Sequence, residues 1–347
     1  MRQSGAFALC RAGFEPDLAA ELTERASLAG IGGYAQTERD TGFVRFFVDA
    51  ADAAALEAKV PWRETVFSRS TLSLLAELRI ADATDRISPM LEVLEGQTFN
   101  DVWVEHPDSE NGKPLSGLAR SLGNALRPAL KRTGILTPGA ERRLHVALLS
   151  GTHIVLGSTR PADASPWPQG IPRLRMLAEA PSRSALKLEE ALMTLVSASE
   201  KAALLKENMR AADLGAAPGG WTWVLLREGL SVIAVDNGPL RQHVMDTGRV
   251  THLREDGFTW RPPQALDWMV CDMVEQPVRV ASRMATWLRE GWCRQSIFNL
   301  KLPMKKRWQE TQRCLTLLSH EAERPLIIRA KQLYHDREEI TVFCRAL

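Results

Sequence analysis

Four ionisable residues mark the ends of apolar stretches in the second half of the chain, which is the pattern of a site that moves protons. Asp272 closes DWMVCD, Lys301 closes SIFNLK and Glu339 opens EITVFCRA, while Lys187 lies in PSRSALKLEEAL. A lysine that ends an apolar strand needs water or a charged partner. Lys187 alone is typical of a helix surface. Together the four residue types indicate general acid–base chemistry.

A glycine-rich stretch, AADLGAAPGGWTW at 211–223, lies between Lys187 and Asp272. Gly215 permits a tight turn, and the adjacent Gly219 and Gly220 allow a ligand to approach the backbone closely. The stretch is no Walker loop, because no Lys-Ser/Thr pair follows the glycines. It is no GxGxxG motif either, because its spacing is GxxxGG.

Two acidic residues then favour one nucleotide-like ligand. Asp236 ends the next apolar stretch, where a carboxylate can accept both ribose hydroxyls. A ribose-binding acid without a pyrophosphate cradle indicates adenosine without phosphates, which is S-adenosylmethionine. Asp256, which ends THLRED, is expected to accept from the adenine amino group. Either acid by itself is more often a turn residue, but the series after this loop favours the cofactor.

The elements that position these residues alternate between helix and strand, which predicts an α/β domain with a mostly parallel sheet. We expect helices at 182–206, 219–229, 278–290 and 304–322. Strands are expected at RAADLG, SVIAVD, VTHLRED, ALDWMVCD, SIFNLKL, LIIRAKQ and EITVFCRA. Ligands of such sheets bind beyond the carboxyl ends of the strands.

The first half reads as α+β and is separated from the second by the proline-rich stretch 158–174. Four prolines there disfavour both helix and central strand. The pattern predicts strands at 42–50, 71–81, 99–107, RRLHVALLS and THIVLGS, and helices at 51–60, 82–96 (with Asp82 as the cap) and 115–134.

Composition excludes several protein classes. The chain has 347 residues, 45% of them hydrophobic and 25% charged, within the globular range. It holds no apolar run of about 18 residues and no signal peptide, so we expect no membrane contact and a cytoplasmic location. Five scattered cysteines without a CxxC pair, and histidines without ligand spacing, predict a reducing environment and no metal. A monomer is expected.

Charge is unevenly distributed. Residues 1–110 hold 10 Lys/Arg against 19 Asp/Glu, whereas residues 111–160 hold 8 against 1. Such a basic block is as consistent with a surface that binds a polyanion as with a solvated helix face. Beside Lys301, the cluster PMKKRW favours phosphate contact. The candidate RNA-binding residues are Arg120, Arg127, Lys131, Arg132, Lys305 and Lys306.

The DLGAAPGGWT loop, the SRSALKLEE segment and the four ionisable residues resemble the K-D-K-E ribose 2′-O-methyltransferases of the FtsJ-like superfamily. The whole chain resembles the RlmM family of 23S ribosomal RNA cytidine 2′-O-methyltransferases. The resemblance implies a Rossmann-like S-adenosylmethionine-dependent methyltransferase domain behind an α+β THUMP/ferredoxin-like domain. The implied parts are a ferredoxin-like segment (1–65), a THUMP-like RNA-binding segment (66–160), a linker (161–176) and the methyltransferase domain (177–347).

The resemblance also implies the residue roles. Lys301 corresponds to the proton acceptor, with Lys187, Asp272 and Glu339 completing the catalytic set. Glu339 is preferred to Glu338 because it directly precedes ITVF. The implied cofactor contacts are Ser184, Ala217, Pro218, Gly219, Gly220, Asp236, Asp256 and Asp272.

These residue types suit methyl transfer to a ribose hydroxyl, a very weak acid that needs a base. Lysine, with an ordinary pKa of about 10.4, is mostly charged near neutral pH. The Lys187 ammonium and the sulfonium would lower the pKa of Lys301, whereas Asp272 and Glu339 would raise it. We expect Asp272 to orient Lys301 and to face the cofactor, and Glu339 to hold Lys187. Which effect prevails stays open at this level.

Three other functions were compared with this interpretation. A nicotinamide-dependent dehydrogenase gains no support from the GxxxGG spacing or from paired lysines. A base N-methyltransferase would show an (N/D/S)PP(Y/F) loop where this chain reads DMVEQP. An RNA-binding protein with an inactive methyltransferase fold accounts for the basic block, but leaves the four ionisable residues as coincidence.

Overall fold

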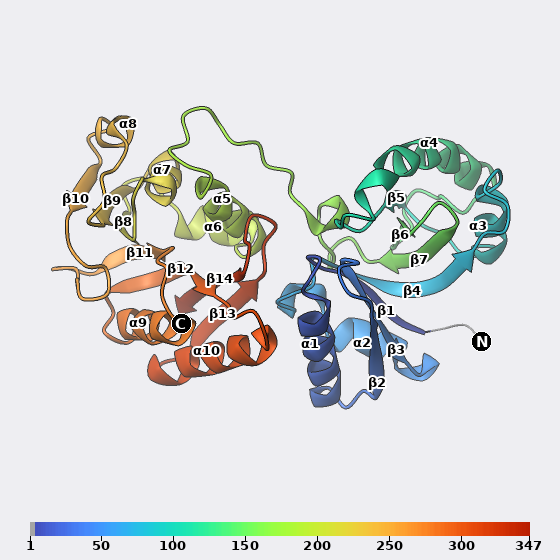
Figure 1. Ribbon diagram of the computed structural model, residues 1–347, viewed down its shortest axis with the longest axis horizontal. Helices are drawn as coiled ribbons and strands as arrows, with labels where there is room; N and C mark the ends of the chain where they lie inside the picture. Colours follow the sequence, from blue (N-terminus) through green and yellow to red (C-terminus); the bar gives the residue numbers. More distant parts are fainter. Residues whose placement is uncertain (1–3) are drawn as a thin grey trace. The chain divides into compact units, whose positions relative to one another are not determined.

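The computed structural model describes residues 4–347 and divides into two compact units, with the division between Pro172 and Arg173 (Figure 1). The division lies within the proline-rich stretch. Part of that stretch is nonetheless anchored to the first unit, because the backbone N–H of Gln169 donates to Glu105 Oε2 over 2.5 Å.

The first unit is built on one seven-stranded sheet in the order β2-β3-β1-β4-β7-β6-β5. The sheet is continuous across the expected segment boundary near residue 65, because β1 and β7 both pair with β4. Its neighbours are antiparallel except for β5 and β6, which are parallel. The strands are β1 Ser4–Leu9, β2 Gly33–Thr37, β3 Phe43–Val48, β4 Ser70–Arg79, β5 Asp101–Glu105, β6 Arg143–Leu148 and β7 His153–Thr159.

Helices cover this sheet in two groups. Helices α1 and α2 pack against β1, β2 and β3, whereas α3 and α4 pack against β4 and β5. In α4, buried Leu122, Leu126 and Leu130 recur at helical spacing, which gives the helix its core-facing side. The helices are α1 Glu15–Leu28, α2 Ala53–Lys59, α3 Ile87–Val93 and α4 Ser116–Arg132, with short 3₁₀ turns at Ala50–Asp52, Trp62–Glu64, Lys113–Leu115 and Pro168–Gly170.

The helix expected over 82–96 is shorter than predicted, and its expected cap is wrong. Asp82 binds the backbone and side chain of Thr84 in a turn before the helix. The carboxylate that meets the helix start is Asp85, which accepts from the backbone N–H groups of Ile87 and Ser88. The local turn thus uses the first aspartate before the helix begins.

The second unit contains a seven-stranded sheet in the order β10-β9-β8-β11-β12-β14-β13. The first five strands are parallel, whereas β14 runs antiparallel to both of its neighbours. The strands are β8 Arg210–Leu214, β9 Ser231–Val235, β10 Val250–Leu253, β11 Leu266–Cys271, β12 Cys293–Lys301, β13 Leu326–Lys331 and β14 Glu339–Ala346.

Helices cover both faces of the second sheet, with α5, α6 and α7 on one side and α9 and α10 on the other (Figure 1). Large apolar side chains, among them Trp268 and Phe343, fill the layer between sheet and helices. The helices are α5 Ala185–Thr194, α6 Ala198–Leu204, α7 Gly220–Arg227, α8 Gln242–Met245, α9 Pro277–Arg289 and α10 Arg307–Glu321.

The single helix expected over 182–206 is wrong, because α5 and α6 are separate. Ser197 interrupts the helix with an extended backbone, and its hydroxyl accepts from the backbone N–H of Glu200. The Glu200 carboxylate accepts in turn from the backbone N–H of Ser197, which completes a capping box. Serine side chains that bind nearby backbone favour a helix start over a helix interior.

The described part of the chain holds no helix long and apolar enough to cross a membrane. All five cysteines are buried and free.

Candidate active site

Two lysines and two carboxylates meet at one edge of the second sheet, a cluster that we call the tetrad (Lys187, Asp272, Lys301 and Glu339). Lys187 Nζ lies 3.1 Å from Asp272 Oδ2 and 2.5 Å from Glu339 Oε1. Lys301 Nζ lies 2.9 Å from Asp272 Oδ1 and also contacts Glu339 Oε2. Each carboxylate therefore bridges both ammonium groups, rather than serving one lysine as expected from the sequence.

The sheet topology explains why these residues meet. Strands β11 and β12 are parallel neighbours, so Asp272, directly after β11, and Lys301, the last residue of β12, lie at the same edge. Strand β14 begins there, with Glu339 opposite Lys301 in the antiparallel register. Residues that face each other across an antiparallel pair stand about 5 Å apart, within reach of an ion pair.

Helix α5, which carries Lys187, is tied to the loop before β14. The buried carboxylate of Glu190 accepts from the backbone N–H groups of Tyr334 and His335 over 2.8 and 2.9 Å. Glu190 Oε2 also lies 2.7 Å from His335 Nδ1. Since the same loop leads into Glu339, these contacts hold the helix and the strand of the tetrad in a common frame.

The structure separates the two adjacent glutamates. Glu339 is buried in the tetrad, whereas the Glu338 carboxylate lies 2.6 Å from the Arg307 guanidinium, near the start of α10. Successive residues of a strand point to opposite faces, so only one of the two can reach the lysines. Glu339 therefore contacts the two lysines and Glu338 does not, while the catalytic role of Glu339 stays a prediction.

The charges of the tetrad set its protonation. Burial raises the pKa of Asp272, but the charges of Lys301 and Lys187 outweigh it and hold that pKa below its usual range. Burial lowers the pKa of Lys301, but Asp272 and Glu339 outweigh it and raise that pKa above the ordinary lysine value. Without a bound cation, therefore, the carboxylates prevail over burial and Lys301 is an ammonium at neutral pH.

The glycine loop turns from β8 into α7 against the segment that leads into α5. Gly215 and Gly219 have φ of +76° and +110°, conformations that other residues rarely adopt. A Cβ on Gly220 would lie 2.2 Å from Ser184 Oγ and 2.6 Å from Ser182 Oγ. The absence of a side chain at Gly220 therefore lets the loop pack directly on Ser184.

The two acids expected to bind the nucleoside lie near this loop in different surroundings. Asp236 follows β9, and its Oδ2 accepts from the backbone N–H of Ala217 over 2.9 Å. Its Oδ1 accepts from the backbone N–H of Gly238 over 2.7 Å. Asp256 is exposed, and its Oδ1 accepts from the backbone N–H of Phe258. Asp236 is thereby fixed beside the loop, whereas Asp256 lies in the turn after β10.

Sequence reasoning did not assign a role to Asp213, the acid that precedes the glycine loop. Its side chain is buried at the end of β8, where Oδ2 accepts from Thr222 Oγ1 of α7 over 2.6 Å. Burial raises the pKa of Asp213 to about 7, an effect that the Thr222 hydrogen bonds oppose and nearby Asp272 and Asp236 reinforce. The sequence feature that could have identified Asp213 is an acidic residue near the end of an apolar strand, directly before the glycine loop.

The residues at this edge fit a cationic adenosine derivative. The glycines leave backbone space, Asp236 presents carboxylate oxygens beside Ala217, and Asp272 offers negative charge to a cation. Within residues 4–347, no cluster of three or more His, Cys, Asp or Glu side chains is arranged to hold a metal ion.

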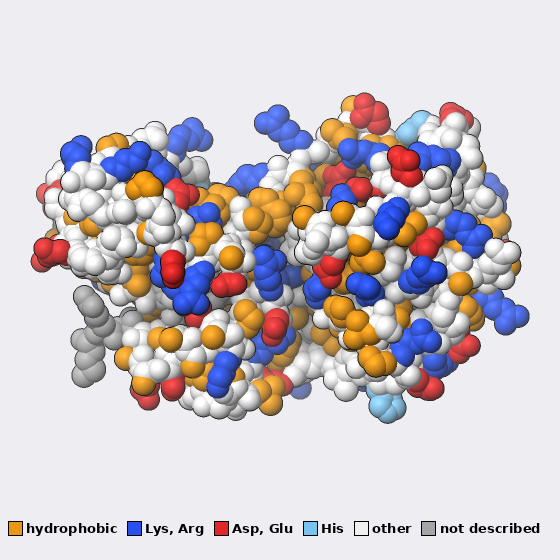
Figure 2. Space-filling model, turned by 180° about the vertical axis from the view of Figure 1, so that it is seen from behind, with side chains coloured by type: hydrophobic (Ala, Val, Ile, Leu, Met, Phe, Trp, Pro, Cys, Tyr) orange, Lys and Arg blue, Asp and Glu red, His pale blue; other side chains and the backbone are white. Residues whose placement is uncertain are grey.

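The expected RNA-binding residues fall into three situations. Arg120, Lys131 and Arg132 are exposed on α4. Arg127 instead lies 2.8 Å from the Asp101 carboxylate and donates to the Val102 carbonyl, which ties α4 to β5. Lys305 and Lys306 are exposed on the loop between β12 and α10. Figure 2 shows basic side chains spread over the surface, with acidic and apolar ones between them.

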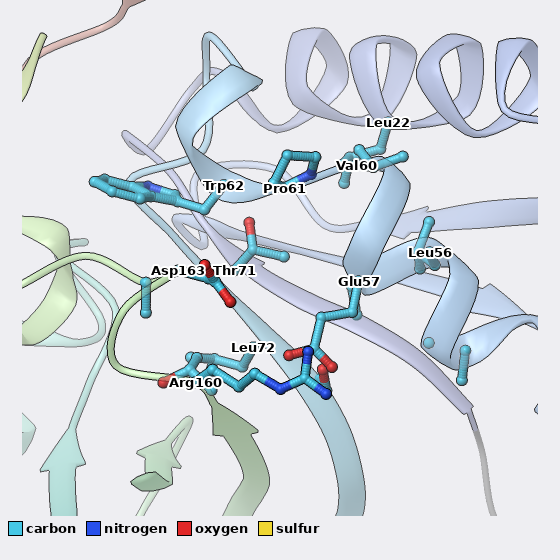
Figure 3. Close-up of a pocket in the computed structure, with 16 residues that line it drawn as sticks. Leu22, Leu56, Glu57, Val60, Pro61, Trp62, Thr71, Leu72, Arg160 and Asp163 are labelled. Carbon is cyan, nitrogen blue, oxygen red and sulfur yellow. The ribbon is translucent and has the colours of Figure 1, made fainter. Parts of the chain in front are cut away.

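A separate pocket lies in the first unit, and none of the tetrad's residues lines it (Figure 3). Leu22, Val60 and Leu72 contribute apolar walls, and its polar rim includes Glu57. Glu57 is already paired with Arg142, at 2.9 Å. Its charged lining residues are Glu57, Arg160 and Asp163, so it holds no group of two lysines and two carboxylates like the tetrad.

Comparison with known proteins identifies relatives along the whole chain. Residues 3–72 match the family model of the RlmM ferredoxin-like domain, residues 85–160 that of the N-terminal part of ribosomal RNA large subunit methyltransferase M, and residues 180–289 that of the FtsJ-like methyltransferases. Ribosomal RNA large subunit methyltransferase M of Xanthomonas euvesicatoria is 64% identical over 343 residues, 98% of both chains. The protein of the same name from Stenotrophomonas maltophilia is 63% identical, over 99% of this chain and 97% of its own.

Proposed function

The chain belongs to the family of ribosomal RNA large subunit methyltransferase M, and we propose that it methylates the ribose 2′-hydroxyl of a cytidine in 23S ribosomal RNA. It is an S-adenosylmethionine-dependent methyltransferase with a Rossmann-like catalytic domain. The observation that carries the proposal is the tetrad, in which two lysines and two carboxylates converge beside the glycine loop.

The cofactor would be held by the loop and by the acids around it. The residues in question are Ser184, Ala217, Pro218, Gly219, Gly220, Asp236, Asp256 and Asp272. When bound, S-adenosylmethionine supplies a methyl group on a cationic sulfur. The backbone of the loop and the Asp236 carboxylate would orient the adenosine, while Asp272 would face the cation.

Lys301 is the general base of the proposed reaction. With two ammonium groups and two carboxylates, the tetrad is close to neutral as it stands. A third positive charge beside it favours loss of a proton, and Lys301 is the group that can release one. Neutral Lys301 then accepts the proton of the ribose hydroxyl, while Lys187, Asp272 and Glu339 fix the position of its amine.

The RNA would contact exposed basic side chains in both units. We assign Arg120, Lys131 and Arg132 of α4, and Lys305 and Lys306 beside the tetrad, to phosphate binding. Arg127 supports α4 through Asp101. Because one chain supplies all four tetrad residues, we infer that a monomer suffices. We place its work in the cytoplasm, with the ribosomal RNA.

Methyl transfer to ribosomal RNA tests this function directly. Total RNA from cells that lack the protein is incubated with the purified enzyme and tritium-labelled S-adenosylmethionine, and the modified ribose is then mapped. We expect label on one cytidine 2′-oxygen of 23S ribosomal RNA. A protein that binds this RNA but transfers no label would instead be an RNA-binding protein with an inactive methyltransferase fold.

Two substitutions test Lys301 as the base. Lys301→Ala and Lys301→Arg should both abolish methylation while cofactor and RNA still bind, because arginine keeps the charge but stays protonated. In the wild type the rate should rise with pH until Lys301 has lost its proton in the cofactor-bound enzyme, since only the neutral amine accepts a proton. Activity in Lys301→Arg would reduce Lys301 to a positioning role.

A further inference from the structure

We propose that Asn299, Thr341 and Asp336 form a hydrogen-bonded relay that positions Asp272 and, through it, Lys301. All three are positioning residues, since none of them belongs to the tetrad. The inference rests on the proposed function, because it concerns how the base of that reaction is oriented.

The relay follows the pairing of β12 with β14. Lys301 stands opposite Glu339, and two residues away on the same face Asn299 stands opposite Thr341. Two successive cross-strand pairs thus form one polar row that leads from the sheet edge into the protein. Asn299, Thr341 and Asp336 are fully buried.

The contacts connect without a gap. Asn299 Nδ2 donates to Asp272 Oδ1 over 2.9 Å, the same oxygen that Lys301 Nζ contacts. Thr341 Oγ1 donates to Asn299 Oδ1 over 2.8 Å. Thr341 Oγ1 also lies 3.0 and 3.2 Å from the two carboxyl oxygens of Asp336.

The chemistry of the groups gives the relay a direction. Ionised Asp272 only accepts hydrogen bonds, so the Asn299 amide must present its N–H to Asp272 and its carbonyl to Thr341. The Thr341 hydroxyl has one proton and directs it to Asn299. The remaining contact then requires a proton on Asp336, which donates to Thr341 Oγ1. The direction runs from Asp336 through Thr341 and Asn299 to Asp272.

The surroundings of Asp336 favour that proton. Burial raises the pKa of Asp336 well above its ordinary value, and the negative charges of Glu339 and Glu190 add to the effect. The backbone N–H of Leu333, which donates to Asp336 Oδ2, and the charge of Lys187 act in the opposite sense. These groups lie on α5, on β14 and on the loop before β14, the elements around the carboxyl.

A fixed donor on Asp272 has two consequences for the base. It holds the carboxylate in the orientation that meets Lys301, and it draws negative charge away from the Lys301 ammonium. Without it, Asp272 would bind that ammonium more strongly and raise the pKa of Lys301 further. Loss of the relay should therefore lower kcat and move the pH dependence of the rate upward.

Thr341→Val and Thr341→Ser form the matched pair of variants, because valine keeps the shape without the hydroxyl and serine keeps the hydroxyl. We expect Thr341→Val to lower kcat roughly tenfold, with unchanged KM for cofactor and RNA and with the rising limb of the pH–rate profile at higher pH. Thr341→Ser should restore both kcat and the profile. A general packing defect would not move the profile.

Asp336→Asn tests whether Asp336 acts as a neutral group, and it does not depend on the stability of the valine variant. An amide can donate to Thr341 Oγ1 and accept from Leu333, so activity and pH profile should match the wild type. Provided that the wild type is active, three results would each overturn the relay. They are normal activity of Thr341→Val, an equal loss of activity in Thr341→Ser and Thr341→Val, or a loss of activity in Asp336→Asn. An inactive wild type would instead show that the proposed function has failed.

Discussion

At the scale of single residues, the site depends on which carboxyl oxygens face which ammonium groups. Asp272 and Glu339 each contact both Lys187 and Lys301, so removal of one carboxylate leaves both lysines with a single partner. Lys301 stays charged in this state, and a further cation beside it shifts the balance toward the free amine. In the proposed reaction, Lys301 need not be neutral before the cofactor binds, because the cofactor would bring the positive charge that favours loss of the proton.

Glu339→Gln and Glu338→Gln compare two adjacent residues with different partners. The first removes a negative charge from the tetrad, so we expect kcat to fall by at least tenfold while cofactor binding persists. The second weakens an ion pair with Arg307. Because Glu338 is half-exposed, this ion pair contributes little to stability, and we expect its loss to change kcat little. Single-turnover methylation measures both. Equal losses in the two variants would mean that the contacts of Glu339 have no special weight.

Asp213 should make the stability of the second unit depend on pH. Its pKa is raised to about 7 in the folded state, so the folded state retains a proton that the unfolded chain releases from about pH 4 upward. The free energy of unfolding therefore declines as pH rises through this window. Asp213→Asn lacks this carboxyl, so its free energy of unfolding should rise relative to that of the wild type by roughly 2 to 3 kcal/mol between pH 5 and pH 8.

Urea unfolding at the two pH values measures that difference. Asp246→Asn, at an exposed carboxyl on the same unit, serves as the control and should show no such trend. If the difference between wild type and Asp213→Asn is the same at both pH values, the carboxyl of Asp213 does not titrate in this range.

At the scale of elements, two features are the expected binding surfaces. The turn from β8 to α7 depends on glycines with positive φ and on the missing side chain at Gly220. Helix α4 buries one side and exposes basic residues on the other. We expect neither feature to carry chemistry and each to supply a binding surface for the proposed reaction.

Gly220→Ala should weaken cofactor binding without unfolding the protein. The added Cβ would come within 2.6 Å of both Ser182 Oγ and Ser184 Oγ and 3.1 Å from the backbone nitrogen of Ala185, so either the two hydroxyls must turn or the loop must shift, and both change the surroundings of Ser184. We expect calorimetry to show at least a tenfold loss of affinity for S-adenosylmethionine, or about 1.4 kcal/mol. Gly117→Ala, in a helix with open space around it, is the matched control and should bind normally.

The exposed face of α4 should contribute affinity for RNA. Replacement of Arg120, Lys131 and Arg132 by alanine should weaken RNA binding and reduce its salt dependence, while cofactor binding stays unchanged. Arg127 is kept, because it pairs with Asp101 and its loss would combine a change in packing with the change in surface charge. The control is Arg39→Ala with Lys206→Ala, two exposed basic residues outside α4. Normal RNA binding by the triple variant at every salt concentration would exclude α4 from the interface.

At the scale of the whole molecule, each unit has its own sheet and its own hydrophobic core. The core of the second unit draws its buried residues from 180–343, and the clusters of the first unit draw theirs from 7–156. The tetrad and the glycine loop belong to the second unit alone. We therefore expect one unit to bind the cofactor and perform the chemistry, and the other to add affinity for RNA.

A fragment of residues 173–347 should fold and bind S-adenosylmethionine as the full chain does. Its methylation of ribosomal RNA should be much weaker, because α4 is missing. Calorimetry and the labelled-methyl assay measure the two properties. A folded fragment that does not bind the cofactor would contradict the assignment of the site to this unit, and full activity would contradict the role of the first.

The sequence by itself determined much of the second unit and less of the first. Alternating apolar runs and glycine positions are local signals, so they predicted the strands, the glycine loop and the acids at the strand ends. These signals did not predict the opening elements β1, α1 and β2. They also predicted one continuous helix over 182–206, whereas Ser197 separates α5 from α6. The segment boundaries and the roles of the site residues remain predictions.

Only the tertiary structure decided which of these residues act together. The register of β12 and β14 places Lys301 opposite Glu339 and joins Thr341 to Asn299, 42 residues apart along the chain. The packing of α4 on β5 likewise places Arg127 beside Asp101, whereas Arg132 of the same helix is exposed. Strand register depends on packing across the whole sheet, and a pKa depends on every charge nearby. Neither the register nor the pKa is a property of a local stretch of residues, so no local sequence pattern could predict them.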